Sequence, residues 1–178
     1  MAFFKKFIPT YFVPKIEDID YDKLKEQGVK SLFFDLDNTL IAYDEDIISN
    51  ETLNLLVELE KSFDVLVISN SKKGRVMPAV HHLKYVYFAK KPTKIGLKKA
   101  LNLVHKQKDE VILVGDQIIT DIFGANRLGI KSILVKPIKK SSDRKITKFN
   151  RKIANMILKG VKKRYPKAYE ELIKPYES

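Results

Sequence analysis

The chain of 178 residues has no cysteine and no tryptophan, and glycine and proline occur only seven times each. The absence of cysteine excludes disulfide bonds, thiolate metal sites and cysteine nucleophiles, and it is consistent with a reducing, cytoplasmic setting. The low glycine and proline content excludes collagen-like and low-complexity architectures. No apolar run reaches the ~18 residues that a membrane-spanning helix needs. No small-residue cleavage site follows the first lysines, so we expect no signal peptide.

Negative charge is scarce in the C-terminal quarter of the chain. Residues 136–178 hold 14 Lys and Arg against 4 Asp and Glu, a net charge of +10, whereas residues 1–135 hold 20 against 18, a net charge of +2. A basic segment attached to a neutral body predicts a polyanionic partner, such as an anionic membrane surface, a nucleic acid or an acidic protein. A well-solvated surface without a partner explains the same numbers, because Lys outnumbers Arg 29 to 5 in the whole chain.

With 44% hydrophobic and 31% charged residues, the composition predicts a folded chain with a sizeable core. Apolar runs alternate with helical patterns in the middle of the sequence. The runs predict strands at 31–35, 64–69, 85–88, 111–115 and 131–135, and the patterns predict helices at 49–60, 73–82, 93–105 and 118–128. Continuous apolar strands separated by helices predict an α/β fold, in which a five-stranded parallel sheet is covered by helices on both faces.

The segments outside this alternation divide the chain into three parts: an N-terminal arm (1–29), a core (30–136) and a basic helical extension (137–178). Residues 143–160 predict a basic amphipathic helix, which Gly160 and Pro166 punctuate, and a short helix follows over 166–173. We expect the apolar face of the first helix to consist of Ile146, Phe149, Ile153, Met156 and Ile157. The extension then either packs on the core or trails from it.

The motif Asp35-Leu-Asp37-Asn-Thr39 directly follows the first predicted strand. Asp, Asn and Thr are common turn and capping residues, so a capped turn explains the pattern in part. Two carboxylates at i and i+2 after a buried strand are costly, however, unless they are paired or bound to a metal. The first carboxylate is placed to act as a nucleophile or metal ligand, and the second to act beside it as an acid or base.

Polar residues also follow the other predicted strands, and the carboxyl ends of parallel strands meet at one edge of a sheet. Asp116 and Asp121 bring further carboxylates to this edge. Several carboxylates without His or Cys suit a hard, oxygen-preferring ion, which favours Mg²⁺ over Zn²⁺. Ser69 and Asn70 begin a helix, where free N–H groups bind phosphate, and Lys91 supplies an ammonium group. Together these segments predict an active site.

Taken in order, these motifs resemble the haloacid dehalogenase (HAD) superfamily of phosphohydrolases. The match is carried by Asp-x-Asp-x-Thr at 35–39, Ser69, Lys91 and Gly-Asp-x-x-x-Thr-Asp at 115–121. The strings Asp-Leu-Asp-Asn-Thr-Leu and Gly-Asp-Gln-Ile-Ile-Thr-Asp are similar to the YqeG-like family of subfamily IIIA, which is related to phosphatidylglycerophosphate phosphatases. The resemblance implies a HAD-type, Rossmann-like core and a Mg²⁺-dependent phosphatase.

The resemblance also implies a role for each matched residue. Asp35 is the nucleophile that forms an aspartyl-phosphate intermediate, and Asp37 protonates the leaving oxygen and then activates water. The phosphoryl oxygens are bound by polar side chains at the strand ends: Thr39, Ser69, Asn70 and Lys91. Mg²⁺ is held by acidic residues of both motifs: Asp35, Asp37 through its backbone carbonyl, Asp116 and Asp121.

No cap domain fits into this chain, because Ile41–Asn50 and the segment between Asn70 and Lys91 are too short for one. A capless site suits a large phosphomonoester: a lipid headgroup in a membrane, a protein or a nucleic-acid end. Among these the resemblance implies phosphatidylglycerophosphate, and we expect a protein that is cytoplasmic or peripheral at the inner face of a membrane. The apolar and basic segment Met1–Phe12 is typical of an interfacial anchor or of an arm packed on the core. The alternative is an RNA- or ribosome-associated factor, or a phosphatase of another phosphomonoester.

Overall fold

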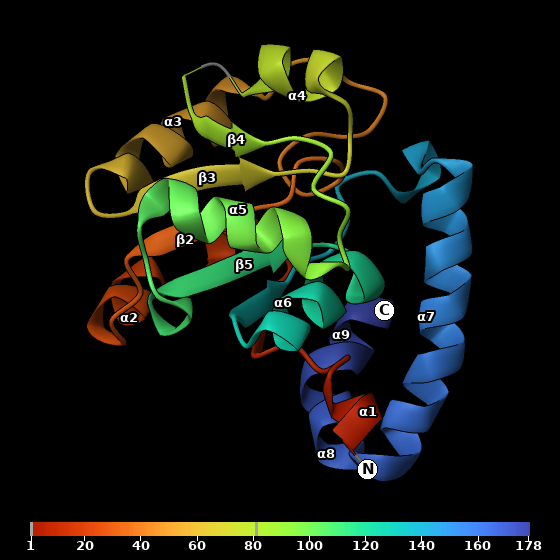
Figure 1. Ribbon diagram of the computed structural model, residues 1–178. Helices are drawn as coiled ribbons and strands as arrows, with labels where there is room; N and C mark the ends of the chain where they lie inside the picture. The colour runs from red at the N-terminus through yellow and green to blue at the C-terminus, as the bar shows by residue number, and fades with distance from the viewer. Residues whose placement is uncertain (1, 81) are drawn as a thin grey trace.

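Within residues 2–80 and 82–178, which the computed structural model describes, six parallel strands form one sheet in the order β1-β6-β5-β2-β3-β4 (Figure 1). Met1 and His81, each part of a segment discussed above, lie outside the described residues. The strands are β1 (Tyr11–Phe12), β2 (Ser31–Phe34), β3 (Asp64–Ile68), β4 (Lys84–Val86), β5 (Val111–Gly115) and β6 (Lys131–Leu134). Because β2 pairs in parallel with both β3 and β5, the predicted parallel α/β sheet is confirmed.

The sheet has one strand more than the five predicted, because the N-terminal arm adds β1 to its edge. Tyr11 and Phe12 pair in parallel with Ile133 and Leu134 of β6. Two paired residues are too few to show a strand pattern in the sequence, and the nearby Pro14 argues against a longer strand. The arm is thereby fixed to the core at this edge.

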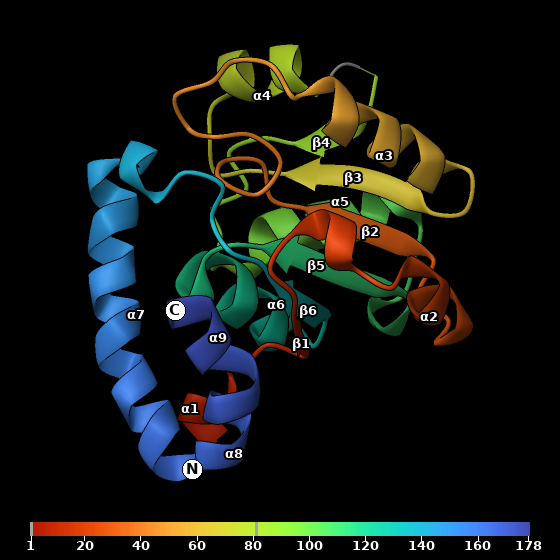
Figure 2. The same ribbon diagram turned by 180° about the vertical axis from the view of Figure 1, so that it is seen from behind.

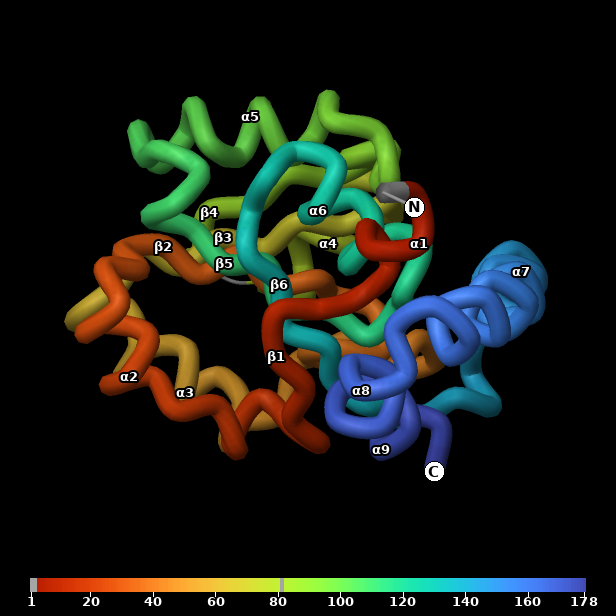
Figure 3. Tube along the Cα trace, turned by 90° about the horizontal axis from the view of Figure 1, so that it is seen from below, coloured from red at the N-terminus to blue at the C-terminus, as the bar shows by residue number. Residues whose placement is uncertain are grey.

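Helices cover both faces of the sheet (Figure 3). One layer consists of α2 (Tyr21–Glu26), α3 (Asn50–Glu60) and α4 (Lys73–Ala79), and the other of α5 (Lys94–Val104) and α6 (Phe123–Leu128). The side chains of β2 alternate between them, since Leu32 and Phe34 pack with the first layer and Phe33 with the second. Burial on both faces explains why the strands read as continuous apolar runs.

Two elements are shorter than their patterns predict. The strand predicted to reach Phe88 ends at Val86, because Phe88 adopts a positive φ of 47° and its backbone N–H donates to the Ser71 carbonyl at 2.9 Å. The helix predicted over 73–82 ends at Ala79, directly after Pro78, whose ring removes a backbone donor from the helix.

The C-terminal extension is helical and packs on the core. It contains α7 (Lys145–Arg164), α8 (Pro166–Ala168), a π-helical segment (Tyr169–Ile173) and α9 (Lys174–Glu177). Short helical turns elsewhere lie at Ile16–Asp18, Lys108–Glu110, Ile118–Ile122 and Lys140–Ser142, and the arm begins with α1 (Ala2–Lys5). Figures 1 and 2 both show α7 standing beyond the carboxyl ends of the strands, with α1 near its lower end.

The arm and the extension share a third core cluster. Phe7 is buried, with its ring stacked on that of Phe123 at a centroid distance of 4.4 Å. Leu158 and Val161 of α7 are buried in the same cluster. Of the arm's aromatic side chains, Phe3 is 55% exposed. Phe7 therefore packs on the core, and it is not free to enter a lipid surface.

Most of the apolar face predicted for α7 does not pack on the core. The buried side chains of α7 are Ala154, Leu158 and Val161, whereas Ile146, Phe149 and Met156 are exposed. The helix also continues through Gly160. The Phe4 ring lies directly against this glycine, where a Cβ atom would overlap it. The glycine at 160 therefore allows the arm to approach α7 closely and does not end the helix. Among the described residues, no helix is both long and apolar enough to cross a membrane.

Candidate active site

The carboxyl ends of the strands point toward α7 (Figures 1 and 2). Residues from the strand ends and from α7 line a pocket of about 210 Å³. One side of it is lined by most of the predicted site residues: Asp35, Asp37, Ser69, Asn70 and Lys91. Its other wall comes from the first turns of α7, through Ile146, Thr147 and Asn150. The segments 41–50 and 70–91 are too short to hold a cap domain. In this chain the C-terminal extension supplies the wall of the pocket that faces the strand ends.

Asp35 reaches the pocket because β2 ends one residue before it. The backbone N–H of Asp35 still donates to the Val114 carbonyl of β5 at 2.8 Å, which fixes the carboxylate at the sheet edge. The chain then turns back sharply, since the N–H of Asn38 donates to the Ile41 carbonyl at 2.7 Å and Asn38 adopts a φ of 67°. Asn is among the few residue types that tolerate this left-handed conformation.

Lys91 links two carboxylates from different strand ends. Its Nζ lies 2.7 Å from Asp35 Oδ1 and 2.7 Å from Asp121 Oδ1, and it also donates to the Ile68 carbonyl at 2.8 Å. Asn70 holds the backbone of Lys91 from both sides: it accepts from the Lys91 N–H at 2.7 Å and donates to the Lys91 carbonyl at 2.8 Å. In the structure Asn70 therefore positions the lysine.

Three buried carboxylates form a compact acidic cluster. Oxygen atoms of Asp35, Asp116 and Asp121 all lie within 4.8 Å of one another. Asp121 comes from a π-helical turn that directly follows β5, and its Oδ2 accepts from the Gln117 N–H at 3.0 Å. Glycine is required at 115, because a Cβ atom there would lie 2.5 Å from the Asp121 side chain. The close approach of turn and strand brings these carboxylates together.

Negative charge in this cluster exceeds what its neighbours neutralise. Burial raises the pKa of the Asp35 carboxyl well above its ordinary value, with Lys91 opposing the shift and the neighbouring carboxylates adding to it. Burial likewise raises the pKa of Asp116 to about 7, against the effect of Arg151. Burial alone would lower the pKa of Lys91, but Asp121 and Asp35 raise it above its ordinary value. A buried cluster of hard oxygen donors with excess negative charge fits a divalent cation such as Mg²⁺.

Asp37 lies outside this cluster, at the rim of the pocket. Its Oδ2 accepts from Ser71 Oγ at 2.7 Å, and its Oδ1 lies 3.2 Å from Arg75 Nε. The hydroxyl of Ser69 is 3.4 Å from the same carboxylate. Partial exposure and polar neighbours leave Asp37 able to exchange protons with a ligand in the pocket.

Thr39 does not face the pocket with the other predicted phosphate-binding residues. Its hydroxyl is directed at Asp116 Oδ1, at 3.5 Å, and its side chain is buried. The first motif thus contacts the second through Thr39, and the predicted role of Thr39 toward phosphate stays a prediction.

Arg151 of α7 is a site residue that the sequence reasoning missed. Its guanidinium forms an ion pair with Asp116, and its Nε lies 2.6 Å from Asp143 Oδ2. Asp143 in turn accepts from Asn38 Nδ2 at 2.6 Å, so the contacts connect α7 to the loop after β2. The only signal in the sequence is that position 151 is an arginine, whereas most basic residues of this helix are lysines. This signal does not predict which residue Arg151 contacts.

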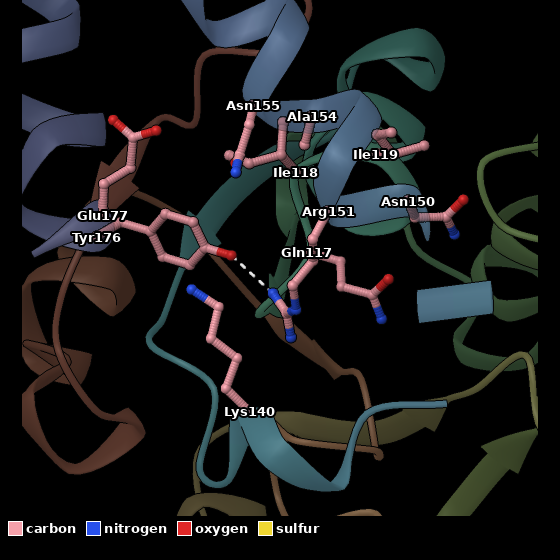
Figure 4. Close-up of a pocket in the computed structure, with 10 residues that line it drawn as sticks. All are labelled: Gln117, Ile118, Ile119, Lys140, Asn150, Arg151, Ala154, Asn155, Tyr176 and Glu177. Atoms are coloured by element: carbon pink, nitrogen blue, oxygen red, sulfur yellow. Dashed lines mark hydrogen bonds between the residues drawn. The ribbon is translucent and has the colours of Figure 1, made fainter. Parts of the chain in front are cut away.

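A second pocket, of about 230 Å³, lies on the other side of Arg151 (Figure 4). Tyr176 closes it: the Tyr176 hydroxyl donates to the Asp116 carbonyl at 2.9 Å and accepts from Arg151 Nη1 at 2.8 Å. Gln117 and Asn150 line both pockets. The backbone and the side chain of Asp116 are therefore both held by the C-terminal extension.

The family described as HAD-hydrolase-like matches residues 88–159, from the loop after β4 into α7. "Probable phosphatase YqeG" of Bacillus subtilis (strain 168) is 35% identical over 170 residues, which cover 94% of this chain and 98% of that protein. The chain belongs to the HAD superfamily, in its YqeG-like family. This HAD protein is also similar to "Phosphatidylglycerophosphate phosphatase 1, chloroplastic/mitochondrial" of Arabidopsis thaliana, at 28% identity over 85% of this chain and 47% of the plant protein.

A solved structure has a similar fold over most of the chain. The crystal structure of a hypothetical protein from Xanthomonas campestris matches with a TM-score of 0.52 at 14% identity, covering 86% of this chain and 98% of that one. The likeness extends beyond the sheet, because 86% of the chain includes part of the arm or the extension. At this identity it shows the fold alone.

Proposed function

We propose that this HAD phosphatase hydrolyses phosphomonoesters through an aspartyl-phosphate formed on Asp35. Its relation to a named phosphatase over nearly its whole length supports the activity. The observation that carries the mechanism is the Asp35–Lys91–Asp121 arrangement, in which one carboxylate of a buried acidic cluster also faces the pocket. A phosphoryl group in this pocket meets a nucleophile and a neutralising ammonium together.

In the first step, a carboxylate oxygen of Asp35 forms a bond to phosphorus while the bond from phosphorus to the ester oxygen breaks. Asp37 gives its proton to that leaving oxygen, and the alcohol departs. The rim position of Asp37, held by Ser71 and Arg75, supports this role because a leaving group extends outward from the pocket. General-acid catalysis of this kind contributes about 10²–10⁴-fold to the rate.

In the second step, Asp37 accepts a proton from a water molecule, whose oxygen attacks the phosphorus. The bond between phosphorus and Asp35 breaks, which releases inorganic phosphate and restores both carboxyl groups to their starting states. Lys91 and the Ser69 hydroxyl, both lining the pocket, bind the phosphoryl oxygens throughout. Asn70 contributes by holding Lys91 in place.

Asp35, Asp116 and Asp121 would hold Mg²⁺, together with the backbone carbonyl of Asp37. When bound, Mg²⁺ neutralises charge on the phosphoryl group and orients it. The raised pKa of Asp116, about 7, supports this assignment, because burial without a compensating cation disfavours its carboxylate. Arg151 supplies part of that compensation from α7.

For the substrate we propose a lipid phosphomonoester, with phosphatidylglycerophosphate as the leading candidate. Its support is the similarity to the Arabidopsis protein and the net charge of +10 over residues 136–178. The pocket, which holds about 210 Å³, is large enough for a phosphoryl headgroup but not for acyl chains. The rest of a lipid would therefore stay outside the protein.

The test is hydrolysis of an aryl phosphate by the full chain with Mg²⁺. EDTA should abolish the activity, and Asp35→Asn should lower kcat at least about 10³-fold, because it removes the group that forms the covalent bond. Asp22→Asn, an exposed aspartate of α2, is the matched control and should act as wild type. If Asp35→Asn keeps more than about a tenth of the activity, Asp35 is not the nucleophile.

The substrate assignment has its own test. Phosphatidylglycerophosphate in mixed micelles should be hydrolysed with a higher kcat/KM than glucose 6-phosphate or glycerol 3-phosphate. The alternative function, in RNA binding, predicts instead that Asp35→Asn leaves the main function intact and that binding to RNA falls steeply with salt. A preference for soluble sugar phosphates would contradict the lipid substrate while leaving the phosphatase chemistry in place.

A further inference from the structure

One side of α7 carries apolar side chains that the fold leaves exposed. Ile146, Phe149, Ile153 and Met156 recur three and four residues apart and so lie along one side of the helix; we call them the outer stripe. Ile146, Phe149 and Met156 are 58%, 57% and 72% exposed. The inner side of the helix already packs on the core through Ala154, Leu158 and Val161. The stripe is therefore a second apolar face, which core packing does not need.

A row of lysines accompanies the outer stripe. Lys145, Lys148, Lys152 and Lys159 are exposed, and the first three each directly precede a member of the stripe. Within the described part of the chain, none of them forms an ion pair, and α7 itself contains no acidic residue. Apolar side chains beside a basic row are typical of helices that lie in the interface of an anionic membrane.

The outer stripe begins at the mouth of the active-site pocket. Ile146, its first member, lines that pocket together with Thr147 and Asn150 of the same helix. Arg151, one turn further on, forms the ion pair with Asp116. A surface that binds the stripe would therefore meet the pocket mouth, on a helix that is fixed to the acidic cluster.

We infer that the outer stripe and its lysine row dock this protein on an anionic lipid surface, so that a lipid phosphomonoester enters the pocket from the headgroup plane. The inference rests on the proposed lipid substrate and names the surface that presents it. Apolar side chains gain free energy by entering the headgroup region, and the ammonium groups gain it from anionic lipids. A second copy of the chain would bring two lysine rows together, and RNA would leave the stripe exposed.

The test measures binding of the full chain to vesicles of phosphatidylglycerol and phosphatidylcholine by co-sedimentation. Wild type should bind these vesicles, less tightly as salt rises, and should not bind pure phosphatidylcholine. Phe149→Gln combined with Met156→Gln should weaken binding at least about tenfold, because two side chains no longer leave water. Its kcat on a soluble aryl phosphate should stay unchanged, since neither residue lines the pocket. Its kcat/KM on phosphatidylglycerophosphate in vesicles should fall with the binding.

The matched control is Ile95→Gln combined with Leu103→Gln, two exposed apolar residues of α5, and it should bind vesicles as wild type does. Asp35→Asn should also bind vesicles as wild type does. Vesicle binding can therefore be interpreted even if the phosphatase assignment fails. Equal binding by wild type and the α7 double variant would overturn the inference. The inference would also be overturned if wild type formed a dimer that the α7 double variant dissociates. Binding of wild type to RNA and not to vesicles would overturn it as well.

Discussion

Two halves of the acidic site are held in different ways. The strand-edge half, Asp35, Lys91 and Asp121, is paired within the core, because Lys91 Nζ lies 2.7 Å from each carboxylate. The helix half, Asp116 with Arg151 and Asp143, depends on α7 for its positive charge. One half is complete as soon as the sheet forms, whereas the other needs the C-terminal extension in place. Mutations can therefore disturb one half of the site without directly removing a contact of the other.

The largest effect should come from the strand-edge half. Lys91→Met should lower kcat on an aryl phosphate about 10²–10³-fold, because the phosphoryl group loses its neutralising ammonium. It should also lower the free energy of unfolding by about 3–5 kcal/mol without Mg²⁺, since two buried carboxylates lose their partner. Urea unfolding with and without Mg²⁺ measures this loss. Lys98→Met, an exposed lysine of α5, is the control; a Lys91→Met enzyme with near-normal kcat would remove Lys91 from the mechanism.

Arg151→Gln should affect the helix half more mildly and in a different parameter. Without the guanidinium, Asp116 loses a cation that competes with Mg²⁺, so the Mg²⁺ concentration for half-maximal activity should fall about tenfold. The free energy of unfolding without Mg²⁺ should fall as well, because a buried carboxylate is left unpaired. Lys152→Gln, the exposed neighbour, should change neither quantity. An unchanged Mg²⁺ titration in Arg151→Gln would mean that the two halves are not distinct.

The pH dependence of the free energy of unfolding gives a third way to compare the two halves of the site. The folded chain holds the Asp116 proton up to a pKa of about 7, whereas an unfolded chain releases it near 3.8. The folded state therefore binds more protons in this window, and the free energy of unfolding without Mg²⁺ should fall as pH rises through it. Urea unfolding of Asp116→Asn should show a shallower pH dependence than wild type. A wild-type stability that rises across this window would contradict the assignment.

The sequence predicts the strand-edge half well for a physical reason. Continuous apolar runs define parallel strands, and the ends of parallel strands meet at one edge, so Asp35, Lys91 and Asp121 can be placed together without coordinates. The same rule also places Asp116, but its partners in the helix half, Arg151 and Asp143, could not be predicted in this way. An amphipathic pattern fixes which residues share a face, but it does not fix which of two apolar faces turns inward. The pattern therefore placed Ile146 and Phe149 on one apolar face without showing that this face stays exposed, and it gave no sign that Arg151 would meet Asp116.

The smallest expected effect concerns how α7 is seated. Gly160→Ala should lower the free energy of unfolding by about 1–2 kcal/mol, because the added methyl group meets the Phe4 ring and outweighs the gain in helix propensity. Gly74→Ala in α4, where nothing lies within 4 Å of the added atom, should instead raise it by about 0.5–1 kcal/mol. If both changes stabilise the protein in urea, the arm does not hold α7 at Gly160.

The pairing of the arm with β6 also sets an order of events during synthesis. Thr10 and Ser132, which hydrogen-bond at this edge, lie 122 positions apart. At about 5–20 residues per second, the ribosome makes the partner of the arm on the order of ten seconds after the arm itself. During this time Phe4 and Phe7 lack the α7 and β6 surfaces that later bury or contact them. The aromatic, basic N-terminal segment is therefore among the first parts of the chain to be made and among the last to acquire its packing partners.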